Sequence, residues 1–352
     1  MPHPPLSIGP VALAAPVLAA PIAGFTDHTF RGVVRGFGGC GLIFTEMVSA
    51  GGWIAGHMPP NRLDGVADEP RPLGVQLWDR DADMIEEAAR RLQDYRVSVI
   101  DLNFGCPKRR IMGKQGAGAT LMRDPATVGR LVAAAVRGAG GIPVTAKMRL
   151  GPDAATLTAP DVARAAEANG AAAVTVHGRT AQQSYGEPCA HTGIRAVVDA
   201  VAIPVIANGD VADAASALKT LAATGAAGVM VAREALTRPW VFREIAAALD
   251  GRAIPPAPTL REQQDLLLEH HRRMVEKEGD ERGTVLMRKF AVRYLTGIPG
   301  ARVLRDALAR AASASEFRDI VAGFEIAEQA TPPRARGRYA LSADDGELRA
   351  VV

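Results

Sequence analysis

Short apolar runs alternate with amphipathic stretches along the chain up to residue 250. The runs are nearly continuous and rich in β-branched residues, which is typical of parallel strands buried on both faces. They predict strands at residues 17–20, 42–46, 73–77, 98–102, 143–148, 173–177, 204–207 and 228–231. The amphipathic stretches predict helices at residues 28–36, 82–94, 125–137, 159–169, 192–200, 212–224 and 239–249. An irregular segment through Pro59 and Pro60 follows the second strand.

Eight successive strand–helix units favour a closed (β/α)8 barrel over an open doubly wound sheet. The strand pattern stops at residues 251–259, whose sequence GRAIPPAPT is typical of a linker. Helical patterns follow at residues 260–278, 284–296, 301–311 and 315–322. We therefore predict an α/β protein, with a (β/α)8 TIM barrel at residues 1–250 and a small C-terminal helical domain at residues 260–325. Residues 326–352 are rich in Pro, Arg and acidic residues, so we expect a disordered tail.

The totals add little beyond a globular protein with ordinary composition. The 352 residues are 48% hydrophobic and 22% charged, and the net charge is +3. Three widely spaced cysteines, Cys40, Cys106 and Cys189, offer no disulfide framework or zinc spacing, so we expect a cytoplasmic protein without a structural metal. Residues 11–23 are apolar, but prolines interrupt them and no Lys or Arg precedes them. We interpret them as the entry to the first strand, and no other stretch is long and apolar enough to span a membrane.

One cysteine lies where chemistry is expected. Cys106 follows the fourth predicted strand in a Gly-Cys-Pro turn, and the Gly-rich loop after it carries Lys108, Arg109 and Arg110. A lone Cys is usually a small buried apolar residue. A strand end, a mobile loop and neighbouring cations favour a catalytic thiol instead.

Polar side chains follow almost every predicted strand. In a (β/α)8 barrel these strand ends meet at one face, where active sites lie. The groups at this face are Glu46, Gln76, Asn103, Lys147, Arg149, His177, Arg179, Asn208, Asp210 and Arg233. Ends seven and eight, around Gly209 and Ala232, are where such barrels commonly bind phosphate. Lys147 and His177 would then face the ring that carries this phosphate, although a Schiff-base lysine of the aldolase type is an alternative for Lys147.

These strand ends belong to longer motifs that resemble one known family. In chain order they are PIAGFTDHTFR, FTEMVSA, VIDLNFGCP with a downstream GKQGAGATLMRDP, PVTAKMRLG, VTVHGRT, PVIANGD and GVMVAREALTRPWVFREI. They resemble the tRNA-dihydrouridine synthases, nearest the bacterial B-type branch, over residues 16–308. The resemblance implies an FMN-binding barrel and a C-terminal helical domain that docks tRNA. It also implies reduction of the C5–C6 double bond of a D-loop uridine, with NADPH or NADH as reductant.

Matched motif by motif, the resemblance also implies roles for individual residues. Cys106 would be the proton donor. The flavin site would comprise Pro21, Ile22, Ala23, Gln76, Lys147, His177, Asn208, Gly209, Asp210, Ala232 and Arg233. We assign contacts with the tRNA substrate to Asn103, Lys108, Arg109, Arg110, Arg179, Arg288, Lys289 and Arg293. We expect a monomer.

Two physical arguments accompany these roles. Hydride addition to uracil C6 requires an acid that protonates C5, and a thiol suits this because a solvated carboxylic acid is ionised at neutral pH. The cations beside Cys106 favour the thiolate, so we expect RNA phosphates to neutralise them and restore the proton. Residues 282–310 carry seven Lys or Arg and one acid, Asp306, and this one-sided charge favours RNA binding over a merely solvated helix face.

The chain departs from the family pattern at several positions. Ala232 replaces a Gly beside the phosphate site, and Glu234 follows the arginine there. Phe290 and Arg293 stand where the family usually has His and Trp. We expect this difference to affect which tRNA uridine is recognised more than the type of reaction. Two rival hypotheses remain open: a flavin barrel that reduces a small molecule, and a non-catalytic RNA-binding paralogue.

Overall fold

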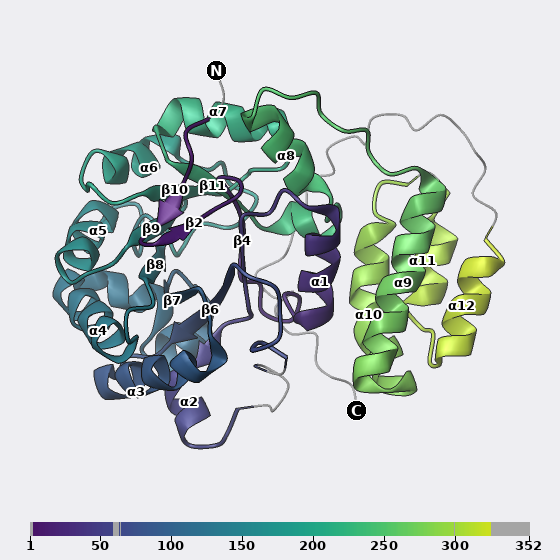
Figure 1. The fold of residues 1–352 in the computed structure, drawn as a ribbon, viewed down its shortest axis with the longest axis horizontal. Coiled ribbons are helices and arrows are strands. Elements are labelled where there is room, and N and C mark those ends of the chain that lie inside the picture. Colours follow the sequence, from purple (N-terminus) through teal and green to yellow (C-terminus); the bar gives the residue numbers. More distant parts are fainter. Residues whose placement is uncertain (1–2, 59–62, 64, 299, 325–352) are drawn as a thin grey trace.

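The structure is a computed structural model that describes residues 3–58, 63, 65–298 and 300–324 (Figure 1). The predicted tail at residues 326–352 and the Pro59–Pro60 segment lie outside the described residues. The chain forms a barrel of strands with helices around it, and a group of four further helices stands beside the barrel, on the side of α1 (His28–Phe37).

The barrel is built from eight parallel strands in chain order. They are β3 (Val17–Ala19), β4 (Leu42–Phe44), β6 (Leu73–Trp78), β7 (Val99–Phe104), β8 (Val144–Met148), β9 (Ala173–His177), β10 (Val205–Asn208) and β11 (Gly228–Val231). Each strand pairs with its neighbours, β11 pairs with β3, and β4 pairs with β6, so the sheet closes. The predicted (β/α)8 fold is confirmed. A short extra strand, β5 (Val48–Ser49), extends the edge of β6.

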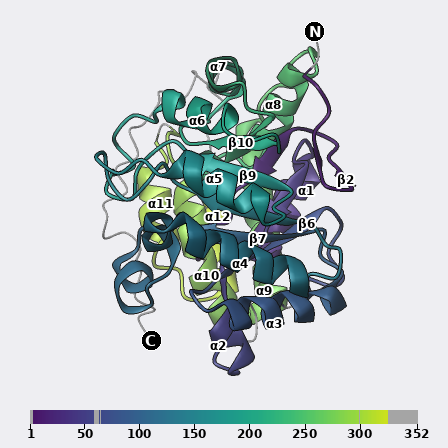
Figure 2. The same cartoon turned by 90° about the vertical axis from the view of Figure 1, so that its left-hand side faces the viewer.

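The predicted helices lie around the barrel within about three residues of their expected bounds. They are α1, α3 (Ala82–Leu92), α4 (Pro125–Gly138), α5 (Ala159–Ala168), α6 (His191–Val198), α7 (Ala214–Thr224) and α8 (Val241–Leu249). Figure 2 shows α3, α4 and α5 along one side of the barrel. Aspartates cap several of them: Asp27 accepts from the Phe30 N–H, and Asp213 forms a capping box. A helix not predicted, α2 (Ala50–Ile54), follows β5.

A short hairpin of β1 (Ser7–Ile8) and β2 (Val11–Ala12) seals the N-terminal end of the barrel. Figure 1 shows β2 lying across the barrel opening. We call the apolar cluster that the hairpin completes the floor; its residues are Leu6, Ile8, Leu13, Leu18, Ala20, Leu42, Phe44, Val99, Ala173, Ile206 and Met230. Residues 11–23 are therefore only partly the entry to the first strand. Strands of two residues are too short to leave a periodic signal in the sequence.

The C-terminal helices are α9 (Leu260–Glu278), α10 (Asp280–Tyr294), α11 (Arg302–Leu308) and α12 (Ala314–Ala322). They pack against α1 through aromatic side chains: the rings of Phe30 and Phe290 stack 5.5 Å apart. Within the group, His270 of α9 hydrogen-bonds the Tyr294 hydroxyl of α10 at 3.0 Å. Burial lowers the pKa of His270 to about 4, so the imidazole is neutral in this contact at neutral pH. In the described part of the chain, no helix is both long and apolar enough to cross a membrane.

Candidate active site

A layer of polar side chains lies directly above the apolar floor. Gln76, Asp101 and Thr145 are register partners on β6, β7 and β8, and all three are buried. Gln76 Nε2 donates to Asp101 Oδ2 at 2.6 Å, and Thr145 Oγ1 donates to Asp101 Oδ1 at 2.7 Å. Asn103 Nδ2 donates to Gln76 Oε1 at 2.8 Å. This hydrogen-bond chain connects the interior of the barrel with its mouth, at the C-terminal ends of the strands.

The chain ends on the turn that carries Cys106. Asn103 Oδ1 accepts from the backbone N–H groups of Gly105 at 3.1 Å and Cys106 at 2.9 Å. The loop then returns, and the Ala119 N–H donates to the Cys106 carbonyl at 3.1 Å. Gly118, at φ +61°, lies so close that a Cβ there would stand 2.7 Å from that carbonyl oxygen. Gly118, the second glycine of the GAG sequence at residues 116–118, is therefore required for the loop to close over the Cys106 turn.

Cys106 is half-buried at the mouth. Burial raises its pKa, although Lys108, Arg149 and Lys147 act in the opposite direction. Lys108, Arg109 and Arg110 are all exposed, so water screens their charges. Burial thus acts more strongly on the pKa of Cys106 than the cations do, and the effect of RNA phosphates on this balance stays a prediction.

Lys147 is half-buried and His177 is buried at the mouth. Lys147 Nζ is 3.0 Å from Asn208 Oδ1, and burial lowers its pKa while the charge of Asp101 raises it. The pKa of His177 lies well below its ordinary value because of burial and the nearby cations, chiefly Arg149. The site thus places an uncharged imidazole near the half-buried amine of Lys147, and that amine also lies near Cys106.

The ends of β10 and β11 form a second part of the mouth. The Asp210 carboxylate pairs with Arg179 at 2.7 Å and with Arg233 at 3.0 Å, and its φ of +54° is unusual for a residue other than glycine. Gly209 has a φ of +116°, and a Cβ there would lie 2.9 Å from the His177 ring. Small residues and a half-buried guanidinium thus lie together, which suits a phosphate group.

The departure at Glu234 has a structural answer. Its carboxylate pairs with Arg238 at 3.3 Å, and Arg238 also pairs with the buried Glu244. The charge of Glu234 is therefore balanced locally, and it adds little repulsion toward a phosphate held by Arg233.

Loops after β3 and β4 complete the rim of the mouth. Pro21 and Ile22 are half-buried and Ala23 is exposed just beyond the end of β3. The Gly24 N–H donates to Glu46 Oε2 at 2.6 Å, which fixes this loop against the end of β4.

Two residues predicted to contact tRNA donate hydrogen bonds within the protein. The Arg179 side chain is 1% exposed, and its donors go to Asp210 and to the Glu187 carbonyl. Arg288 donates to the carbonyl of Ala311 at 2.8 Å, in the segment between α11 and α12. Arg179 is a correction, because its buried guanidinium is not presented to a ligand at the surface. The half-buried Arg288 can still reach a ligand, so its contact with tRNA stays a prediction.

The other predicted contacts from α10 reach the barrel. Lys289 Nζ lies 5.4 Å from the centre of the Phe25 ring, and the guanidinium of Arg293 lies 4.8 Å from the same ring. Phe25 belongs to the loop after β3, and its ring meets Phe290 edge to face at 5.5 Å. The departures Phe290 and Arg293 therefore both pack on the rim of the mouth.

Sequence reasoning noted Arg149 at a strand end without assigning it a role, and it missed Tyr185. Arg149 is buried, donates to the Thr180 carbonyl at 2.6 Å and to the Gly105 carbonyl at 3.1 Å, and so braces the Cys106 turn. Tyr185 stacks on His177 and lies under Arg149 and Arg233, 5.3 and 5.2 Å from the ring centre. The two-residue spacing from Lys147 could have identified Arg149, but Tyr185 lies in a loop with no periodic signal.

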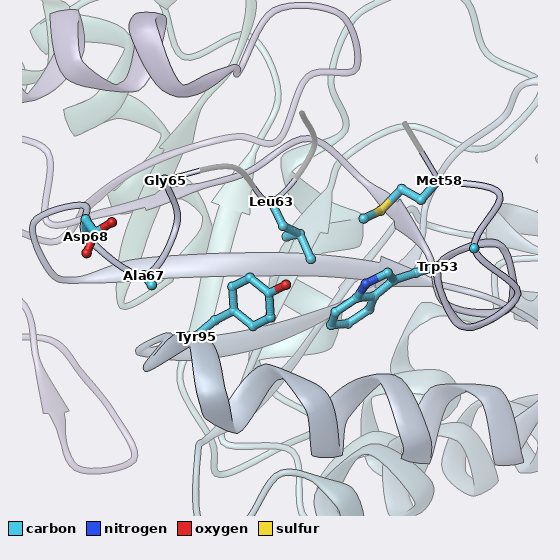
Figure 3. A pocket seen from close by; sticks show the side chains of 8 residues that line it. Trp53, Met58, Leu63, Gly65, Ala67, Asp68 and Tyr95 are labelled. Atoms are coloured by element: carbon cyan, nitrogen blue, oxygen red, sulfur yellow. The ribbon is translucent and has the colours of Figure 1, made fainter. Parts of the chain in front are cut away.

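A separate cavity of about 520 Å³ lies beside α2, away from these residues (Figure 3). Trp53 and Tyr95 form one wall, with ring centres 5.8 Å apart. Met58 and Leu63, also in its lining, flank residues 59–62, which are not described, so we assign no ligand to it. Among the described residues, no group of three or more His, Cys, Asp or Glu could hold a metal ion.

The fold is a (β/α)8 barrel whose mouth brings a thiol together with the cations Lys147 and Arg149. A sequence profile described as "Dihydrouridine synthase (Dus)" matches residues 17–331. A "Probable tRNA-dihydrouridine synthase" from Rhodobacter capsulatus is 42% identical over 81% of this chain and 87% of its own length. One from Mycobacterium tuberculosis is 40% identical over 88% and 82%. The "tRNA-dihydrouridine synthase B" of Pseudomonas aeruginosa is 38% identical over 88% and 95%.

This chain belongs to the dihydrouridine synthase family, so the resemblance predicted from its motifs is confirmed, and with it the class of oxidoreductase. A solved nitroalkane oxidase from Streptomyces ansochromogenes also matches, with a TM-score of 0.40 and 20% identity over 65% of this chain and 66% of that one, too distant for any assignment.

Proposed function

We propose that this protein is an FMN-dependent tRNA-dihydrouridine synthase that uses NADPH, or NADH, to reduce the C5–C6 double bond of a D-loop uridine. The observation that carries the proposal is the half-buried thiol of Cys106 on its braced turn at the end of β7, near Lys147 and Arg149, with burial raising its pKa. A thiol held in this way can give a proton to uracil C5 at neutral pH, which is the step that the family reaction requires of the protein.

The donor set of the mouth fits FMN. Arg233 and the small residues Gly209 and Ala232 supply a cation and backbone N–H groups for the phosphate, with Asn208 beside them for the ribityl chain. Asp210 is an anion, so it would act by orienting Arg233 and not by touching the phosphate itself. Gln76, Lys147 and His177 would face the ring system, and Pro21, Ile22 and Ala23 would form its apolar wall.

Bound FMN, once reduced by NADPH, would supply the hydride for uracil C6. The residues of this protein would supply the proton and stabilise the charge that its loss leaves on sulfur. As C6 gains the hydride, the electron pair of the C5–C6 bond takes the proton from Cys106, so one S–H bond breaks and one C–H bond forms. The thiolate that remains lies within the field of Lys147 and Arg149, which stabilise it until solvent returns a proton.

The target uridine must leave the tRNA stack to enter the mouth, at a cost of a few kcal/mol. Contacts with RNA phosphates would offset this cost. The exposed Lys108, Arg109 and Arg110 lie on the Cys106 loop, and Lys289 and Arg293 lie on the rim where α10 meets the barrel. These cations flank the mouth from two sides, so a tRNA could contact both while one base enters between them. A monomer in the cytoplasm remains our expectation.

The test is reduction of tRNA in vitro, followed by dihydrouridine mapping of tRNA from a strain that lacks the gene. Purified protein with FMN and NADPH should convert one D-loop uridine of unmodified tRNA, and the deletion strain should lack dihydrouridine at that position. Flavin turnover only with a small enone would support the small-molecule barrel. Salt-sensitive tRNA binding without flavin would support the non-catalytic paralogue.

A further inference from the structure

The polar layer contains one ionisable group for which the proposed reaction has no role. Asp101 is 1% exposed, in the middle of β7. A buried carboxyl is costly unless its oxygens accept hydrogen bonds. Both oxygens of Asp101 do so: one accepts from Gln76 and the other from Thr145. Of the cations described around it, Lys147 supplies the opposing charge.

The hydrogen bonds that leave Asp101 run in one direction only. Burial raises the pKa of Asp101 to about 6, which still leaves the carboxylate mostly ionised at neutral pH. It then has no proton to give, so Gln76 must present its NH2 group to Asp101 and its carbonyl to Asn103. Asn103 must then present its own NH2 group to Gln76, which leaves its carbonyl for the Cys106 turn. Backbone N–H groups can only donate, so the turn requires a carbonyl at that place. The Asp101 carboxylate at one end of this series of hydrogen bonds and the backbone N–H groups of the turn at the other therefore require the same orientation of the two amides.

We propose that Asp101 is a positioning residue that orients Gln76 and Asn103 and so holds the Cys106 turn closed. The proposed function is needed only for the catalytic consequence; the structural claim concerns the thiol itself. Without an acceptor at position 101 the Gln76 amide loses its partner and can turn over, and Asn103 Nδ2 then loses the Gln76 carbonyl to which it donates. The turn would open more often, and the thiol would meet solvent.

The test is the alkylation rate of each cysteine in the full-length protein as purified. Iodoacetamide labelling followed by peptide mass spectrometry reports Cys106, Cys189 and Cys40 separately. Cys40 is distant from the chain of hydrogen bonds and reports general opening of the fold. Asp101→Leu removes both acceptor oxygens at similar volume, whereas Asp101→Asn keeps one carbonyl toward Gln76 without the charge.

We expect Asp101→Leu to raise the labelling rate of Cys106 by about tenfold, the factor associated with one or two lost hydrogen bonds, with little change at Cys40. Asp101→Asn should stay within about threefold of the wild type, because the direction of the chain survives. Gln76→Leu cuts the same chain at its middle and should reproduce the effect, which keeps the test available if Asp101→Leu fails to fold. Thr145→Val is the matched control, because Thr145 donates to Asp101 but not toward the turn.

An unchanged Cys106 rate in both Asp101→Leu and Gln76→Leu would overturn the proposal. So would a parallel rise at Cys40, which indicates general loosening, or an equal rise in Asp101→Asn, which indicates a role of charge alone. A Thr145→Val rate as high as that of Asp101→Leu would overturn it as well. If the wild-type protein forms no dihydrouridine, the proposed function fails, but the labelling pattern still decides the role of Asp101.

Discussion

The floor and the mouth of the barrel are built from the same strands and have opposite chemistry. On β7 the three inward positions are Val99 in the apolar floor, Asp101 in the polar layer, and Asn103 under the Cys106 turn. Successive inward positions are two residues apart along the strand. The floor is apolar and the N-terminal hairpin covers it. The mouth instead carries the thiol of Cys106, the amine of Lys147 and the imidazole of His177. Stability and chemistry are thus assigned to opposite ends of one sheet, as the (β/α)8 fold permits.

The largest expected effect lies at the mouth. Cys106→Ala should lower the rate of uridine reduction about 10³-fold, the range lost when a general acid is removed, while flavin reduction by NADPH stays within about twofold. Stopped-flow absorbance of the flavin separates the two half-reactions. Cys40→Ala is the control for loss of a cysteine elsewhere. Equal loss of both half-reactions would show that Cys106 supports the flavin site and not protonation.

A cavity in the floor should lower the stability of the fold and leave the chemistry of the mouth unchanged. The Phe44 ring packs over Gly74, where a Cβ would lie 2.4 Å from it, so the aromatic ring fills this part of the barrel. Phe44→Ala should lower the free energy of unfolding by about 3 kcal/mol, measured by urea denaturation. The folded variant should keep the Cys106 labelling rate of the wild type. A large change in that rate would mean that floor and mouth are coupled more strongly than the separate layers indicate.

An ion pair outside the barrel gives a pH test of stability. Burial alone would raise the pKa of Glu69, but hydrogen bonds from Arg31 and His28 lower it to about 2. The contribution is present above the unfolded pKa near 4.5 and is lost as pH falls toward 2. A shift of this size corresponds to about 3 kcal/mol at most, and to less once the cost of burying the pair is counted.

Glu69→Gln should therefore flatten the loss of stability between pH 4.5 and 2, and urea denaturation at several pH values measures this. The catalytic half-reactions of the folded variant should not change at neutral pH. The same acid slope in Glu69→Gln and the wild type would assign acid sensitivity to other carboxyls.

The smallest effect is expected on the rim. Arg293→Ala removes one cation that lies over Phe25, so tRNA affinity should fall by a few-fold and the slope of log K against log salt should decrease by about one. Val285→Ala, an exposed change on the same helix, is the matched control. Flavin reduction should be unaffected in both. An unchanged salt slope would place the tRNA elsewhere on the protein.

Much of this molecule was readable in the sequence because the relevant signals are local. A parallel strand buried on both faces needs a continuous apolar run, so all eight barrel strands were predicted from runs such as those at 73–77 and 228–231. The position of Cys106 after a strand and before a Gly-rich loop was equally local. The fold class and the family followed from these runs and motifs.

Other properties were decided only by tertiary structure. The surroundings of a charged side chain decide whether a ligand can reach it. Arg179 is buried against Asp210, and Arg288 donates to the backbone between α11 and α12. The pKa of Cys106 depends on burial, which outweighs the cations next to it in the sequence. The hairpin that seals the floor is too short for a periodic pattern. The hydrogen bonds from Asp101 to the Cys106 turn depend on the pairing of β6 with β7, because the register of the two strands places Gln76 beside Asp101 and within reach of Asn103.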